Sequence, residues 1–208
     1  MTIVSLKTGT QEGICLHKIE LSDSSLLFIK DYYLNHYPGI LRAGTEISSA
    51  EEEALRFADV CFRVERVGRR LIARAEQTQA GLFRKLEARF HELACVSAVM
   101  ARFIENNLVN DERYAECWLR SRLARKSGKV GGPRRLSVAL GSRGIGREAI
   151  KGALDKALDE ETEYNLLQRF LAKKPPGTMT GTYSLRGRLK HEGFSTPVID
   201  RYFDETSD

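Results

Sequence analysis

Residues 136–154 read LSVALGSRGIGREAIKGAL, a stretch in which two apolar pairs, Leu136 with Leu140 and Ile150 with Leu154, flank a glycine-rich centre. Within each pair the spacing is four residues, which places both side chains on one face of an α-helix. The glycines between the pairs favour a turn. The stretch therefore predicts two short helices joined by a tight turn, with their apolar faces in a common core.

The same four-position pattern occurs twice more in the chain. The other copies are Leu82, Leu86, Val96 and Met100, and Leu185, Leu189, Ile199 and Phe203. Every position shifts by 54 residues from the first copy to the second and by 49 from the second to the third. A period near 50 marks one supersecondary unit that buries its apolar face partly through its neighbours. The sequence predicts a mainly α fold, an elongated tandem array of three three-helix repeats.

The N-terminal segment differs from the repeats. Gly13–Leu21 and Leu26–Lys30 are short β-prone runs, and a helix with an acidic first turn is expected after a cap at Ser48 or Ser49. We therefore expect a small β-containing segment at 1–57. The three repeats are predicted at 58–110, 111–158 and 159–208. In the second repeat, Asn110 is a good N-cap and Pro133 suits the first position of a helix.

Composition narrows the class of protein. No apolar run is long enough to span a membrane, the N-terminus lacks the pattern of a secretory signal, and the four cysteines lack the spacing of a zinc site or a disulfide framework. We expect a cytoplasmic protein, a monomer that does not bind membranes. The net charge of +5 is uneven, being −3 over residues 1–57, +10 over 58–158 and −2 over 159–208. A central basic block indicates nucleic acid, or a protein assembled on it, as the partner.

The basic block is densest at residues 120–135, which hold seven basic residues and no acidic ones around a glycine-rich bend. Such a cluster neutralises phosphates or an acidic protein surface; the alternative is a solvated charged corner without a partner. We expect the double charge reversal Arg134→Glu with Arg135→Glu to abolish modulation of the partner while leaving helicity and melting unchanged. The candidate partner-binding residues are Arg120, Arg125, Lys126, Lys129, Arg134 and Arg135, with Arg84 and Lys85 of the first repeat extending the surface.

Other residues of the second repeat are expected to be structural. On a helical wheel Arg122 falls in the middle of the apolar face, which indicates an ion pair, with Asp111 or a carboxylate of a neighbouring repeat as its partner. Trp118 falls at a core position, although its ring is also of the kind that stacks on bases. Leu136, Leu140 and Ile150 are core positions of the period.

Motifs for catalysis are missing from the sequence. The glycine-rich stretch at 141–146 lacks the Lys-Ser/Thr of a phosphate-binding loop, and the four histidines show no pairing four residues apart. We predict no catalytic residue, no metal ligand and no cofactor, so the protein is not expected to be an enzyme.

The chain resembles a known family. The residues that carry the resemblance are Asn110–Ala115, Trp118–Arg122 and Gly132–Leu136, with looser similarity at Arg74–Thr78 and Gly193–Ser195. They resemble the RecX family, whose members regulate the RecA recombinase. The resemblance covers roughly residues 65–205. Phe90 stands where the family pattern has a glycine between two helices, so that turn is expected to be built differently.

The resemblance implies a function. A member of this family would bind the RecA filament on single-stranded DNA and modulate it, mostly by inhibiting ATP hydrolysis and strand exchange, in recombination, DNA repair and the SOS response. Its own contact with single-stranded DNA would be weak and non-specific. Two alternatives stay open: a stand-alone DNA-binding regulator built from helix-turn-helix-like units, and an enzyme that acts on nucleic acid.

Overall fold

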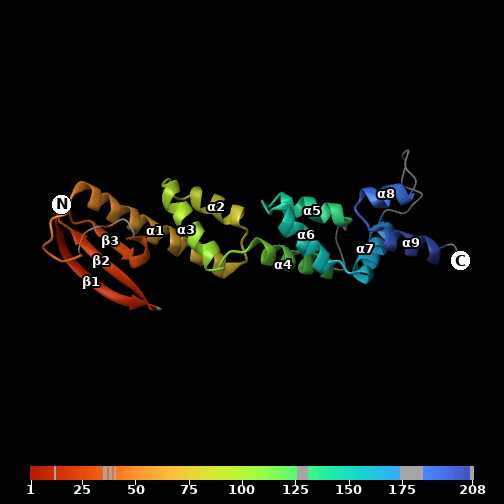
Figure 1. Ribbon diagram of the computed structural model, residues 1–208, viewed down its shortest axis with the longest axis horizontal. Coiled ribbons are helices and arrows are strands. Elements are labelled where there is room, and N and C mark those ends of the chain that lie inside the picture. Colours follow the sequence, from red (N-terminus) through yellow and green to blue (C-terminus); the bar gives the residue numbers. More distant parts are fainter. Residues whose placement is uncertain are drawn as a thin grey trace. The chain divides into compact units, whose positions relative to one another are not determined.

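The structure is a computed structural model that describes residues 1–11, 13–34, 37, 39, 41–125, 131–173 and 185–206. Contacts divide the chain into two compact units. Unit 1 comprises Met1–Glu76 and Leu82–Val109, and unit 2 comprises Gln77–Gly81 and Asn110–Asp208. The predicted fold class, mainly helical with a small β-containing N-terminal segment, is confirmed (Figure 1). None of the helices in the described part of the chain combines the length and apolarity that crossing a membrane requires.

Unit 1 begins with an antiparallel sheet in the order β1-β2-β3, formed by Ile3–Gln11, Ile14–Leu21 and Leu26–Lys30. The two predicted β-prone runs are β2 and β3. The first strand was not predicted, because its second half is polar and includes Gly9. Its residues are extended because they pair with β2, from Gln11 opposite Ile14 back to Ile3 opposite Leu21.

The long helix α1, Ser49–Arg74, runs beside the sheet (Figure 1). Ser48 and Glu51 form a capping box at its start: the Glu51 amide donates to Ser48 Oγ at 3.3 Å, and the Ser48 amide donates to Glu51 Oε2 at 2.8 Å. The boundary predicted between residues 57 and 58 falls inside this helix. The predicted division into an N-terminal segment and three repeats stays a prediction.

After α1 come α2, Gln79–Glu87, and α3, Leu93–Glu105. The first-copy residues Leu82, Leu86, Val96 and Met100 all lie in the core of unit 1. Helix α3 approaches α1 closely at Gly68, where an added Cβ would lie 2.4 Å from the Phe103 ring. This glycine lets the aromatic ring pack directly on the backbone of α1.

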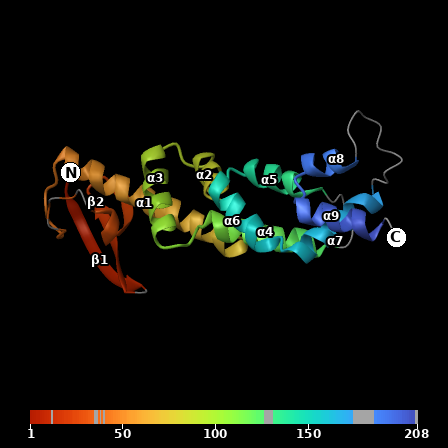
Figure 2. The ribbon, with the colours of Figure 1, turned by 45° about the vertical axis from the view of Figure 1, so that its right-hand side comes forward.

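Unit 2 contains the second and third copies of the pattern. Its helices are α4, Asp111–Ala124; α5, Pro133–Gly141; α6, Arg147–Ala157; α7, Glu160–Lys173; α8, Leu185–His191; and α9, Thr196–Glu205. Helix α4 lies beside α6, and α7 lies beside α9 (Figure 2). Asn110 caps α4 by accepting a hydrogen bond from the Arg113 amide at 2.9 Å, and Pro133 begins α5. The side chains of Leu136, Leu140 and Ile150 are buried in the core of this unit.

The turn between the second and third helices of each copy shows how the repeats differ. In the second and third copies the turn contains Gly144 and Gly193, with φ of +85° and +89°. The offsets of 54 and 49 residues make Phe90 the equivalent residue of the first copy. Phe90 does not adopt a left-handed backbone and packs against the core of unit 1 instead. The expectation that this turn is built differently is therefore confirmed.

Candidate partner-binding surface

Arg120 is exposed on α4, next to an ion pair between Lys156 Nζ and Glu116 Oε1 at 2.7 Å. The hydrogen bond and the charge of Lys156 lower the pKa of the Glu116 carboxyl, and the charge of Arg120 lowers it further. These three charged groups carry a net charge of +1 at neutral pH. They surround a shallow cavity of about 290 Å³ that is lined by Glu116, Arg120, Leu123, Ala153, Lys156 and Ala157.

Arg125 follows the last turn of α4 and is exposed. Arg169 of α7 reaches the same helix end: its Nη1 donates to the Leu123 carbonyl oxygen at 2.9 Å, and its Nη2 donates to the Arg125 carbonyl oxygen. A guanidinium at this position satisfies carbonyl groups that have no partner within the helix and interacts favourably with the helix dipole. Arg169 was missed in the sequence because it lies 46 residues from Leu123 and no local pattern marks it.

Arg134 and Arg135 lie in the first turn of α5, and both side chains are exposed. Arg134 already has partners: its Nη1 donates to His191 Nε2 at 2.6 Å and to the His191 carbonyl oxygen at 3.3 Å. The Arg134 guanidinium therefore joins α5 to α8, so for this residue we expect charge reversal to affect melting. Arg135 is the residue of this pair whose head group is the better candidate for a partner.

The other four predicted contact residues stay predictions. Lys126 and Lys129 lie outside the described residues. Arg84 and Lys85 are exposed on α2, but they belong to unit 1. Their role as an extension of the surface stays a prediction.

The interpretation of Arg122 needs correction. Its side chain is exposed, and no carboxylate in the described part of the chain pairs with it. Its guanidinium lies 5.9 Å from the centre of the Trp118 ring, and that of Arg143 lies 5.0 Å from the same ring. Trp118 itself is half-buried against the core, so the apolar face ends at the indole, and Arg122 covers the ring from the solvent side. A helical wheel gives direction around the axis but not how far the neighbouring helices extend.

The described residues include no cluster of histidine, cysteine, aspartate or glutamate side chains able to hold a metal ion. The surface offers guanidinium and ammonium groups on a helical frame, and such groups bind anions through charge-assisted hydrogen bonds.

The fold and this surface define a helical-repeat protein with an exposed basic face on its second unit. The family model for the second three-helix domain of RecX matches residues 110–154, and the protein named regulatory protein RecX from Treponema pallidum (strain Nichols) is 30% identical over 159 residues, covering 76% of this chain and 94% of that protein. The chain belongs to the RecX family of regulatory proteins.

Other comparisons agree. The regulatory protein RecX of Thermobifida fusca (strain YX) is 32% identical over 153 residues, which cover 71% of this chain and 80% of that protein. A crystal structure of a regulatory protein RecX matches with a TM-score of 0.71 at 20% identity, covering 98% of each chain. At this identity the structural match shows the fold, over nearly the whole chain.

Proposed function

We propose that this chain binds the RecA recombinase filament on single-stranded DNA and modulates it, mostly by inhibiting ATP hydrolysis and strand exchange during recombination and DNA repair. We further propose that it acts as a cytoplasmic monomer. The supporting observation is that Arg120, Arg125 and Arg135 are exposed on the segment that matches the family's second three-helix domain. The ATP-hydrolysing chemistry belongs to the recombinase in this proposal.

The basic face explains how a helical-repeat protein would recognise such a filament. Phosphates of bound DNA and acidic protein side chains both present anionic oxygens. One guanidinium group binds two such oxygens at once through two parallel hydrogen bonds. Each phosphate contact releases counterions, so binding that depends on these arginines weakens as salt concentration rises. The proposed contact would displace neither core packing nor the α5–α8 contact, because the side chains of Arg120 and Arg135 are exposed to solvent.

The test is the rate of ATP hydrolysis by the cognate recombinase, preassembled on single-stranded DNA, as this protein is titrated in. The unmodified chain is expected to lower the rate at less than one copy per recombinase subunit. A variant carrying Arg120→Glu and Arg135→Glu is expected to need at least tenfold more protein for the same fall. Both side chains are exposed, so the two substitutions leave the core of unit 2 intact.

A matched control carries Arg147→Glu and Lys151→Glu. Both residues are exposed on α6, and their helical positions point away from α4. The control changes the net charge by the same amount as the Arg120→Glu, Arg135→Glu variant. A general loss of electrostatic attraction would therefore weaken inhibition equally in the two variants. Unchanged ATP hydrolysis with the unmodified chain, together with tight protection of one duplex sequence, would instead support the stand-alone DNA-binding regulator.

A further inference from the structure

One face of the N-terminal sheet gathers basic and aromatic side chains. In antiparallel pairs, residues directly opposite each other share a face, and so do residues two apart on one strand. Lys7 lies opposite Lys18, and Lys18 lies opposite Phe28; one step along, Leu16 lies opposite Lys30. All five side chains therefore lie on the same face. The opposite face carries Ile19, Leu27 and Ile29, which are buried in the core of unit 1.

The two lysines at the centre of this face are an unfavourable pair in isolation. Lys7 and Lys18 face each other across adjacent strands, both are exposed, and like charges at directly opposite positions destabilise a sheet. Glu20 is the carboxylate nearest along β2 on this face, and its Oε2 accepts a hydrogen bond from the Ser5 hydroxyl at 3.1 Å. An anionic ligand between the lysines would remove the repulsion.

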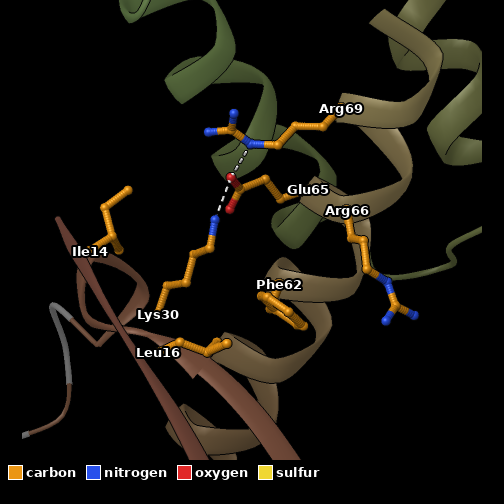
Figure 3. A pocket seen from close by; sticks show the side chains of 7 residues that line it. All are labelled: Ile14, Leu16, Lys30, Phe62, Glu65, Arg66 and Arg69. Atoms are coloured by element: carbon orange, nitrogen blue, oxygen red, sulfur yellow. Dashed lines mark hydrogen bonds and ion pairs between the residues drawn. The ribbon is translucent and has the colours of Figure 1, made fainter. Parts of the chain in front are cut away.

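The face continues into a cleft between the sheet and α1 (Figure 3). The cleft has a volume of about 270 Å³ and is lined by Ile14, Leu16, Lys30, Phe62, Glu65, Arg66 and Arg69. The buried Glu65 carboxylate is already occupied, since it accepts hydrogen bonds from Lys30 at 2.9 Å and Arg69 at 2.6 Å. Arg66 is exposed, and among the described residues no carboxylate pairs with it. The face and the cleft together thus carry five cationic side chains and two carboxylates. The cationic side chains are Lys7, Lys18, Lys30, Arg66 and Arg69, and the carboxylates are Glu20 and Glu65.

Two aromatic rings border the same face. Phe28 and Phe62 stack with ring centres 6.0 Å apart and planes 23° from parallel, and Lys30 Nζ lies 6.0 Å from the centre of the Phe62 ring. Both rings are half-buried, and neither is part of the packed core of unit 1. Half-exposed rings beside a row of cations are the combination by which proteins bind single-stranded nucleic acid: the rings stack on bases, and the cations contact the backbone.

We propose that unit 1 binds single-stranded nucleic acid on this face, with phosphates on Lys7, Lys18 and Arg66 and a base against Phe62 in the cleft. The proposal stands apart from the proposed function, because it requires no recombinase and uses no residue of unit 2. Flat stacking on Phe62 and the lack of amide side chains along the cleft mean that the site takes any sequence. A free nucleotide shares the chemistry of one base and its phosphates.

The experiment is fluorescence anisotropy of a labelled oligothymidylate of roughly 16 nucleotides, the upper end of the site sizes of such surfaces. It uses the full chain carrying Arg120→Glu and Arg135→Glu, so that contacts of the unit 2 surface are suppressed. In this background, Phe62→Leu is expected to weaken binding about tenfold while keeping an apolar side chain in the cleft. Adding Lys7→Glu and Lys18→Glu is expected to make the binding constant less sensitive to salt. The slope of the logarithm of the binding constant against the logarithm of the salt concentration should fall in magnitude by about 1.4, or about 0.7 for each lost phosphate contact.

Matched controls separate the site from general effects. Phe90→Leu changes a half-buried phenylalanine in the α2–α3 turn, and Arg147→Glu with Lys151→Glu changes the same net charge in unit 2; each is expected to alter affinity by less than about twofold. The Lys7→Glu, Lys18→Glu chain still has like charges facing each other, so its melting temperature is expected to match that of the background.

Competition identifies the ligand. Displacement of the label by unlabelled oligothymidylate but not by ATP assigns the site to a strand, and displacement by both at equal phosphate concentration assigns it to single nucleotides as well. Two results would overturn the proposal: affinity unchanged by the Phe62 and lysine substitutions, or displacement by an oligoglutamate peptide at a lower charge concentration than by the strand. The second result would assign the face to an acidic protein segment.

Discussion

The Arg134 backbone amide donates a 2.9 Å hydrogen bond to the carbonyl oxygen of Glu192. It brings the start of α5 against the α8–α9 turn, where a Cβ on Gly193 would lie 2.9 Å from Arg134 N. An equivalent contact occurs elsewhere in unit 2. The Thr78 hydroxyl donates to the Arg143 carbonyl oxygen at 3.0 Å, and a Cβ on Gly144 would lie 2.4 Å from Ala80 Cβ. The offset of 49 residues relates the two carbonyl groups and the two glycines, and the offset of 54 relates Ala80 to Arg134. The hydrogen-bond donors are not equivalent, because one is the Thr78 hydroxyl and the other the Arg134 amide. The period in the sequence therefore describes where a helix start docks on a turn, but not which group donates.

Gly193→Ala is expected to destabilise unit 2 by more than about 1 kcal/mol, because alanine disfavours a left-handed backbone and its Cβ would press on α5. Gly152→Ala is the matched control. This glycine is exposed within α6, and nothing lies within 4 Å of an added Cβ, so alanine is expected to stabilise by about 0.5–1 kcal/mol. Urea unfolding followed by the fluorescence of Trp118, the single tryptophan of the chain, measures both. Shifts of the same sign would contradict the docking role of Gly193.

Thr78→Ala removes a hydroxyl with two partners. Thr78 Oγ1 accepts from the Gly81 amide at 2.9 Å, at the start of α2, and donates to the Arg143 carbonyl oxygen. The side chain is buried, so we expect a loss of about 1–2 kcal/mol. Thr78→Ser keeps the hydroxyl and should retain most of the stability. Equal losses in the two variants would show that the methyl group, not the hydroxyl, is what matters.

Arg134→Glu and Arg135→Glu are expected to differ in stability although they make the same change of charge. The first loses the hydrogen bonds to His191, which we expect to cost about 0.5–1 kcal/mol at this exposed position, and the second should leave the melting temperature within about a degree. Thermal unfolding followed by circular dichroism distinguishes them. An identical melting temperature for both variants would mean that the contact with His191 adds nothing to stability.

Glu65 is expected to make unit 1 sensitive to acid. Burial raises the pKa of its carboxyl, but hydrogen bonds from Tyr32, Lys30 and Arg69 lower it more, so the net pKa lies below its usual value. A carboxyl with a lowered folded pKa adds stability that is complete above its unfolded pKa of about 4.3 and is lost as pH falls through the folded pKa. Glu65→Gln should therefore unfold more easily at pH 7 and depend less on pH below about 4.

The measurement for Glu65 is urea unfolding by far-ultraviolet circular dichroism between pH 7 and pH 3, with Trp118 fluorescence as an internal reference because that residue lies in unit 2. The substitution should shift the circular dichroism transition, which includes the sheet and helices of unit 1, more than the fluorescence transition. A variant with unchanged pH dependence would show that carboxyl groups other than Glu65 set the acid response of unit 1.

Much of the fold could be predicted from sequence because its signals are local. Four apolar positions define each copy, and a glycine turn marks the second and third. Asn110 and Pro133 mark helix starts, and the resemblance at residues 110–136 identifies the family. Strand β1 was missed because its conformation depends on pairing with β2. The site was predicted only as a region, because its details depend on helices far apart in the chain. These details are the exposure of Arg135, the hydrogen bond from Arg134 to His191 and the cap that Arg169 provides for α4.

The docking contact at Gly144 and Gly193 depends on few properties of the residues involved. Its shared parts are a carbonyl oxygen, a hydrogen-bond donor near a helix start and the space left by a missing Cβ. The donor is the Thr78 hydroxyl in one contact and the Arg134 amide in the other. A segment of the gene copied in tandem would therefore supply both halves of the contact at once. Phe90 is the position at which the first copy lacks the glycine that this contact uses.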